Sequence, residues 1–296
     1  MGTPSILELI KKRIVVLDGA MGSALIAAGL KGGTPPESWN VEKPEIIKKI
    51  HSEYFAAGSD VVFTNTFGGT RIKLEAMKHG DKVEEYNAAA VEIAREVCPE
   101  NGFVAGDIGP TGKFLPPVGK ITTDDFDENF LEQAKILLKN KVDLFCIETM
   151  SDIVEAVSAV KAVRKVSNLP IIASITFQKT KRGYFTIMGN TVEDSMTALV
   201  SAGADVVGAN CTIGSDDMID LVPLLKSATK APICVKPNAG KPELISGETV
   251  YSMTSEQFTQ DILQMIEKEA NVVGGCCGTD PEFIRTLTTA IKGRTT

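Results

Sequence analysis

The feature that most constrains the fold of this chain is a regular alternation of short apolar runs with helix-like segments. The apolar runs, rich in β-branched residues, number eight: Ile14–Leu17, Asp60–Phe63, Phe103–Ala105, Leu144–Ile147, Ile171–Ile175, Val206–Val207, Ile233–Val235 and Asn271–Val273. Between them lie segments with apolar side chains at helical spacing, such as Pro44–Ala57 and Asp152–Val166. The pattern predicts eight successive βα units.

The apolar character of the runs predicts a closed barrel. Parallel strands that are apolar throughout are buried on both faces, and eight βα units without a break in composition close most naturally into a (β/α)₈ TIM barrel. We therefore expect an α/β protein with a single domain over residues 1–296. A doubly wound open sheet is the alternative. Two insertions, residues 112–123 and 178–190, follow the third and fifth runs, where barrel enzymes carry functional loops.

Charge and composition exclude several classes of partner. Lys and Arg number 31 against 38 Asp and Glu, which gives a net charge of −7 without a basic block. This balance argues against nucleic-acid or anionic-membrane partners. No apolar stretch is long enough for a membrane span, and the mixed amino terminus does not resemble a signal peptide, so we expect a cytoplasmic protein. The six cysteines are then thiols, available for metal binding or chemistry.

Three of the cysteines follow predicted strands and form the sharpest motif. Cys211 follows the sixth run, and Cys276 and Cys277 follow the eighth, between glycines. Because these two strand ends lie near each other around a barrel, the three side chains can converge at its rim. Three thiolates suit zinc and leave a fourth position exchangeable, which is the catalytic arrangement. The remaining three are interpreted as small buried apolar residues: Cys98, Cys146 and Cys234.

Carboxylates also gather at strand ends. Asp18, Asp107 and Glu148 follow the first, third and fourth runs, where they can hold an ammonium group or simply cap the next helix. The glycine-rich stretches after the second and third runs offer backbone N–H groups to an anion, or form tight turns. The two histidines, His51 and His79, lie in helical segments and are interpreted as exposed or capping residues.

Taken together, the strand-end sequences resemble the homocysteine S-methyltransferase family over nearly the whole chain. The matching motifs are Leu17–Gly22, Thr64–Phe67, Asp107–Pro110, Glu148–Thr149, Asn210–Cys211, Pro237–Gly240 and Gly274–Thr279. The double-cysteine motif with its distant Asn-Cys partner is the specific part. Within the family, the chain is most similar to the amino-terminal homocysteine-binding modules of cobalamin-dependent methionine synthases, which are zinc-containing (β/α)₈ barrels.

The resemblance implies roles for particular residues. Zinc would be held by the three thiolates of Cys211, Cys276 and Cys277, with Asn238 as an oxygen ligand when substrate is absent. The amino-acid end of homocysteine would be bound around four residues, namely Asp18, Thr66, Asp107 and Glu148. The nucleophile would be the thiolate of homocysteine, bound to zinc, and no protein side chain would attack. The product would be methionine.

The methyl donor is the least determined part of this hypothesis. The betaine-dependent branch carries aromatic residues where this chain has Gly68 and Thr149, so the cage for a quaternary ammonium donor is missing. We expect a methylcorrinoid, either methylcobalamin or a corrinoid protein, supplied by a separate methyl carrier or by further carboxyl-terminal modules. S-methylmethionine or another small donor is the alternative.

Two other functional classes fit parts of the sequence. Lys236, at the end of the seventh run, is a candidate for Schiff-base chemistry in an aldolase, because a lysine in an apolar barrel can have a depressed pKa. A zinc-stabilised module that docks a corrinoid protein without chemistry of its own is the non-enzymatic alternative.

Overall fold

Eight parallel strands form the centre of the computed structural model, which describes residues 5–245 and 248–294. They are β1 (Val15–Val16), β2 (Val61–Phe63), β3 (Phe103–Ile108), β4 (Leu144–Met150), β5 (Ile171–Ile175), β8 (Val206–Gly214), β9 (Ile233–Asn238) and β12 (Ala270–Val273). Their order in the sheet is β1-β12-β9-β8-β5-β4-β3-β2. A parallel bridge between Leu17 and Val61 joins the two outermost strands. The sheet therefore closes into the predicted barrel, and the open doubly wound sheet is excluded.

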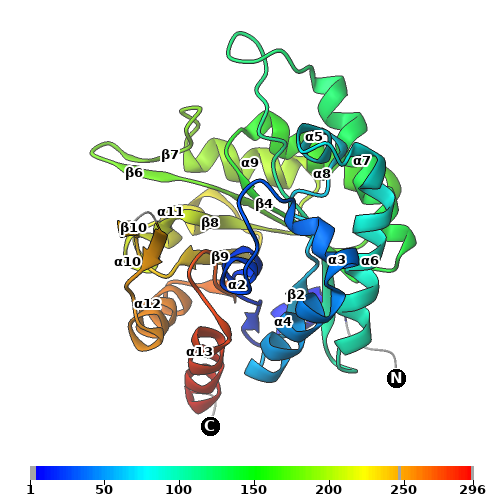
Figure 1. Cartoon of the computed structure of the whole chain (residues 1–296). Helices are drawn as coiled ribbons and strands as arrows, with labels where there is room; N and C mark the ends of the chain where they lie inside the picture. The colour runs from blue at the N-terminus through cyan, green and yellow to red at the C-terminus, as the bar shows by residue number, and fades with distance from the viewer. Residues whose placement is uncertain (1–4, 246–247, 295–296) are drawn as a thin grey trace.

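Helices surround the barrel (Figure 1). In the described residues the α-helices are α1 (Ile6–Ile10), α2 (Met21–Ala27), α3 (Trp39–Glu42), α4 (Pro44–Ala57), α5 (Arg71–Ala76), α6 (Val83–Val97), α7 (Thr123–Lys139), α8 (Ile153–Val166), α9 (Val192–Ala202), α10 (Ser215–Met218), α11 (Val222–Ala228), α12 (Ser255–Glu267) and α13 (Pro281–Arg294). Short 3₁₀ helices span Pro36–Ser38 and Gly80–Lys82. The periodicity over Pro44–Ala57 predicts α4 with both of its bounds, because Pro44 opens it and a left-handed Gly58 ends it.

The insertions take two different forms. Residues 178–190 contain a hairpin of β6 (Gln178–Thr180) and β7 (Gly183–Phe185), whereas residues 112–122 form a long loop before α7. Both project beyond the barrel (Figure 1). A third excursion, the hairpin of β10 (Pro242–Ile245) and β11 (Glu248–Tyr251), follows β9 and was not expected from the sequence. Part of its turn, residues 246–247, lies outside the described residues, as do the two ends of the predicted domain, residues 1–4 and 295–296.

The apolar core explains which end of the barrel can hold a site. The interior is filled by a cluster that includes Leu17, Phe63 and Phe103, and Ile6 and Ile10 of α1 belong to the same cluster. Ile6 also borders the same hollow as Phe103 and Pro170, which stand at the amino-terminal ends of β3 and β5, so α1 covers this end of the barrel. A larger cluster packs the helices onto the outer face of the strands. The carboxyl ends of the strands therefore form the end where a cavity can open.

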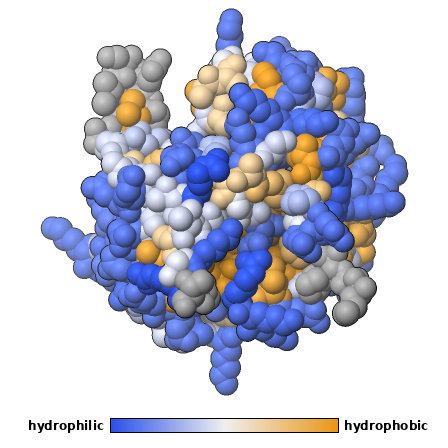
Figure 2. Space-filling model, turned by 90° about the horizontal axis from the view of Figure 1, so that it is seen from below, coloured by the Kyte–Doolittle hydropathy of each residue, from blue (hydrophilic) through white to orange (hydrophobic). Residues whose placement is uncertain are grey.

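The molecular surface agrees with the composition. On the face seen from below, hydrophilic side chains predominate and apolar ones gather in smaller groups between them (Figure 2). No helix in the described part of the chain combines the length and the hydropathy needed to cross a bilayer.

Candidate active site

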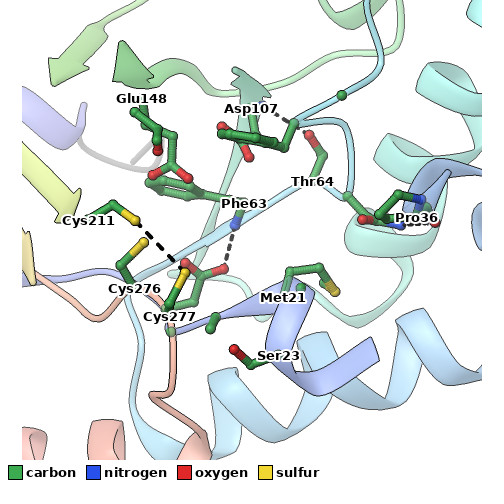
Figure 3. A pocket seen from close by; sticks show the side chains of 18 of the residues that line it. Met21, Ser23, Pro36, Phe63, Thr64, Asp107, Glu148, Cys211, Cys276 and Cys277 are labelled. Carbon is green, nitrogen blue, oxygen red and sulfur yellow. Dashed lines mark hydrogen bonds between the residues drawn. The ribbon is translucent and has the colours of Figure 1, made fainter. Parts of the chain in front are cut away.

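A cavity of about 440 Å³ opens at the carboxyl ends of the strands, a size that is ordinary for a small-molecule site. Its walls come from the ends of β1, β2, β3, β4, β8 and β9 and from the loop that joins β12 to α13. Figure 3 shows three cysteines on one side of the cavity, Glu148 and Asp107 along another wall, and Pro36 far from the cysteines. The predicted strand ends thus meet in one place.

The three predicted zinc cysteines converge. The Sγ atoms of Cys211, Cys276 and Cys277 all lie within 4.8 Å of one another, and those of Cys211 and Cys277 are 3.8 Å apart. A tetrahedral zinc site with Zn–S bonds of about 2.3 Å has S–S edges of about 3.8 Å. The spacing therefore fits three corners of such a tetrahedron, with the fourth corner left for another ligand.

The irregular backbone at the ends of the strands orients these side chains. The pairing of β8 with β9 shifts register between Asn210 and Gly214, and Cys211 has a left-handed φ of 58°. Thr149 on β4 also has a positive φ, 61°, and the buried Asn210 holds it through two 2.8 Å hydrogen bonds, one to its N–H and one to its hydroxyl. Strained residues of this kind persist only where their surroundings fix them. Sequence reasoning gave Asn210 no role of its own.

The double cysteine is anchored by its backbone. The Cys276 N–H donates to Pro237 O at 2.8 Å, and the Ala239 N–H donates to Cys277 O at 3.0 Å, so this loop is tied to the end of β9. Gly275 is required here, because a Cβ at this position would lie 2.2 Å from Thr279 Oγ1. The glycines of the motif therefore allow the close approach that brings two successive thiols to the cavity.

Hydrogen bonds among the three thiols shift their pKa values in opposite directions. Hydrogen bonds from Cys211 and Cys276 lower the pKa of Cys277 to about 3, whereas the bonds that Cys276 makes with the other two thiols raise its pKa well above the usual value. Asn238, at the end of β9, is buried, and its Oδ1 has no hydrogen-bond partner in the described chain. Its orphaned amide oxygen fits the predicted oxygen ligand, although Asn238, unlike the three cysteines, is not among the residues that line the cavity.

Two buried carboxylates keep free oxygens. Asp18 accepts the Phe63 N–H at 2.7 Å through Oδ2, but its Oδ1 and the Oδ1 of Asp107 have no hydrogen-bond partner among the described residues, although Asp18 Oδ1 lies 4.0 Å from Lys236 Nζ. Burial raises the pKa of Asp18 to about 7. Burial and the Glu148 carboxylate raise the pKa of Asp107 well above its usual value. Unpartnered buried acceptors are costly, so both atoms are suited to a cationic ligand.

The third predicted carboxylate already has a cationic partner. Glu148 Oε2 accepts a hydrogen bond from Lys236 Nζ at 2.9 Å, and both side chains are buried. Although burial alone lowers the pKa of Lys236, Glu148 and Asp18 raise it well above its ordinary value. This opposes the aldolase hypothesis, because a Schiff-base lysine needs a depressed pKa.

Several predicted residues lie elsewhere than expected. Thr66 does not line the cavity: its hydroxyl donates to Asp107 O at 2.7 Å and contacts the Thr64 hydroxyl, while Thr64 itself forms part of the wall. Thr66 thus supports the wall and offers no side-chain atom to a ligand. Cys146 and Cys234 are buried as predicted, but Cys98 is only half-buried.

The prediction for the histidines was wrong in one case. His51 is fully buried within α4, and neither of its ring nitrogens has a partner among the described residues. His79 immediately precedes a 3₁₀ helix and bonds to the Tyr86 hydroxyl at 2.8 Å. The helical pattern around His51 placed it on the inward face together with Ile47 and Tyr54, a signal that the sequence carried.

The fold and the cavity define a TIM-barrel protein with a thiol-lined centre beside buried carboxylates. The sequence model of one family, homocysteine S-methyltransferase, matches residues 15–291, and the chain belongs to this family. Methionine synthase from Mycobacterium tuberculosis is 30% identical over 306 residues, covering 97% of this chain and 25% of that protein. Methionine synthase from Mycobacterium leprae is similar to the same extent. The chain thus spans about a quarter of the length of these curated relatives.

Solved structures with the same fold include a homocysteine methyltransferase. The metallated form of the homocysteine methyltransferase MmuM from Escherichia coli superposes with a TM-score of 0.81 at 23% identity, covering 96% of this chain and 98% of that one. The carboxyl transferase domain of Rhizobium etli pyruvate carboxylase is more distant, with a TM-score of 0.54 at 14% identity and coverage of 95% and 47%. At these identities the likeness establishes the barrel fold alone.

Proposed function

We propose that this chain is a zinc-dependent homocysteine S-methyltransferase that forms methionine. One observation carries the proposal: three thiols at the spacing of a tetrahedral zinc site line the same cavity as two buried carboxylates, each with an oxygen that makes no hydrogen bond in the described structure. Cys211, Cys276 and Cys277 would hold the ion, and Asn238 would occupy the fourth position when no substrate is bound. Membership of the homocysteine S-methyltransferase family supports the choice of reaction.

Zinc, when bound, would supply the chemistry that a free thiol lacks at neutral pH, since it would take the homocysteine sulfur as a ligand and keep it deprotonated as the nucleophile. The electron pair of that sulfur forms the new S–C bond, and the pair of the broken methyl–donor bond leaves with the donor. The protein contributes three thiolate ligands, which keep the site electron-rich, and a cavity that excludes water with apolar residues such as Phe63 and Met21.

The charged groups at the amino-acid end of homocysteine need complementary groups in the wall of the cavity. The ammonium group of homocysteine would pair with Asp18 and Asp107, whose Oδ1 atoms make no hydrogen bond in the described structure, while Glu148 is hydrogen-bonded to Lys236. Thr66 would act only indirectly, because its hydroxyl donates a hydrogen bond to the backbone carbonyl of Asp107. No protein nucleophile is required in this scheme, and the proton that the homocysteine thiol loses would pass to solvent or to a nearby carboxylate.

The proposed donor is a methylcorrinoid, carried by a separate corrinoid protein or by further modules of a longer chain. The 30% identity to methionine synthases supports this class. A betaine cage is disfavoured, because Gly68 and Thr149, which both line the cavity, carry no aromatic ring. A cytoplasmic location stays a prediction from the composition.

A donor panel tests the proposal. Zinc-loaded protein would be given homocysteine with methylcobalamin, S-methylmethionine, methylfolate or betaine in turn, and methionine would be measured. We expect turnover with methylcobalamin and none with betaine. Turnover only with S-methylmethionine would favour the small-donor alternative. Absence of methionine with every donor, together with tight binding of a corrinoid protein, would favour a docking module.

A further inference from the structure

A single lysine is buried among the carboxylates of the cavity. Lys236, on β9, is 3% exposed. Its Nζ lies 2.9 Å from Glu148 Oε2, 4.0 Å from Asp18 Oδ1 and 3.7 Å from the centroid of the Phe63 ring. These three contacts come from β4 and from the ends of β1 and β2, so the ammonium group is fixed from several sides.

The lysine changes the charge balance of the cavity. Four acidic residues line the cavity, Asp18, Glu37, Asp107 and Glu148; when all are ionised they carry a charge of −4, and Lys236 with Lys73 reduces this to −2. The carboxylates of Asp107 and Glu148 lie close together, within 4.8 Å. Lys73 forms no ion pair with Asp18, Asp107 or Glu148 in the described structure.

This balance matters for the kind of thiol that the cavity accepts. An amino-acid thiol carries an ammonium group and a carboxylate, whereas an amine thiol carries the ammonium group alone. The ionised carboxylates of the cavity favour both ammonium groups, but they repel the carboxylate of the amino acid, and this repulsion is strong where water is excluded. A neighbouring cation offsets it.

We propose that Lys236 is a specificity-determining residue whose charge lets the cavity accept the α-carboxylate of an amino-acid thiol and so selects homocysteine over thiols that carry only an amine. The inference rests on the proposed function, because it assumes that a thiol substrate binds in this cavity. Specificity arises here from a difference in affinity between a zwitterionic thiol and a cationic one.

The test is direct binding to the zinc-loaded protein by isothermal titration calorimetry. Three thiols form the panel: homocysteine, 3-mercaptopropylamine, which lacks the carboxylate, and 4-mercaptobutyrate, which lacks the amine. Lys236→Met removes the charge, and Lys236→Gln removes it while keeping a hydrogen-bond donor toward Glu148. Lys241→Met is the matched control, because Lys241 is 71% exposed and pairs with Asp217 at 3.3 Å. Zinc content and thermal melting are recorded for each variant.

We expect both Lys236 variants to bind homocysteine and 4-mercaptobutyrate about tenfold more weakly or worse, while 3-mercaptopropylamine binds as well as before or better. Lys241→Met should behave as the wild type. An equal loss for all three thiols would reveal a merely structural role and overturn the inference, as would an unchanged ratio of homocysteine to 3-mercaptopropylamine. If the wild type bound none of the thiols, the proposed function itself would fail, which is a separate result.

Discussion

Replacing Glu148 with glutamine should destabilise the protein, because it leaves a buried ammonium group without its main partner. In the native structure, the Glu148 and Lys236 side chains are 10% and 4% exposed and are joined at 2.9 Å. Glutamine has nearly the same shape but no charge. The change therefore isolates the ion pair from the packing around it.

The structure sets the expected magnitude. Removing one partner of a buried ion pair costs about 3–5 kcal/mol, because the other charge stays buried and uncompensated. Asp18, 4.0 Å from the Lys236 ammonium, compensates in part. We therefore expect the lower end, a loss of about 3 kcal/mol in the free energy of unfolding. Adding Lys236→Met to the variant should recover part of the loss, because both charges are then gone.

Equilibrium unfolding in urea measures this loss. Far-UV circular dichroism and the fluorescence of the buried Trp39, the single tryptophan, should give coincident transitions, which licenses a two-state free energy. The control is Glu267→Gln, which breaks a 2.8 Å pair with Arg294 whose side chains are 62% and 50% exposed. An exposed pair contributes about 0–1 kcal/mol. A loss at Glu148 no larger than that of the control would refute the reasoning.

Three further predictions concern the metal and the pH dependence of stability. The native chain should bind about one zinc ion, measured by elemental analysis, and the double variant Cys276→Ala, Cys277→Ala should bind none. The control variant Cys98→Ala should keep its zinc. Full zinc occupancy in the double variant would contradict the zinc assignment. Removing zinc with a chelator should leave the far-UV circular dichroism unchanged, since the core does not depend on the ion, and cooperative unfolding on chelation would show a structural metal. Burial lowers the pKa of His51 to about 4, so the unfolded chain binds the extra proton between about pH 4 and 6.5, and stability should fall as the pH drops through that window. In His51→Leu this fall should shrink by up to about 3 kcal/mol, as judged from urea unfolding at each pH; an unaltered pH profile would contradict the burial argument.

The sequence predicted the barrel because periodicity is a local property. Each apolar run between two helical stripes is visible in a short window, and the parallel order follows from their repetition. The same logic located the site, since carboxyl ends of barrel strands meet in space. Cys211 and Cys277, 66 positions apart, could be brought together by topology alone.

Contacts that depend on side-chain direction could not be predicted in this way. Lys236 and Glu148 are 88 positions apart, and nothing in either segment indicates that they face each other across the barrel. Thr66 belongs to a matching motif, yet the irregular backbone after β2 turns its hydroxyl toward Asp107 O. The hairpin of β10 and β11 was missed because its four-residue strands are too short for a clear alternation.

The most direct test of the central claim is zinc K-edge X-ray absorption with and without homocysteine. The claim is that Cys211, Cys276 and Cys277 provide three sulfur ligands and that the substrate sulfur becomes the fourth. We expect three sulfur scatterers at about 2.3 Å plus one lighter ligand in the free protein, and four sulfur scatterers once homocysteine is bound. A sulfur count that did not change on adding saturating homocysteine would contradict it.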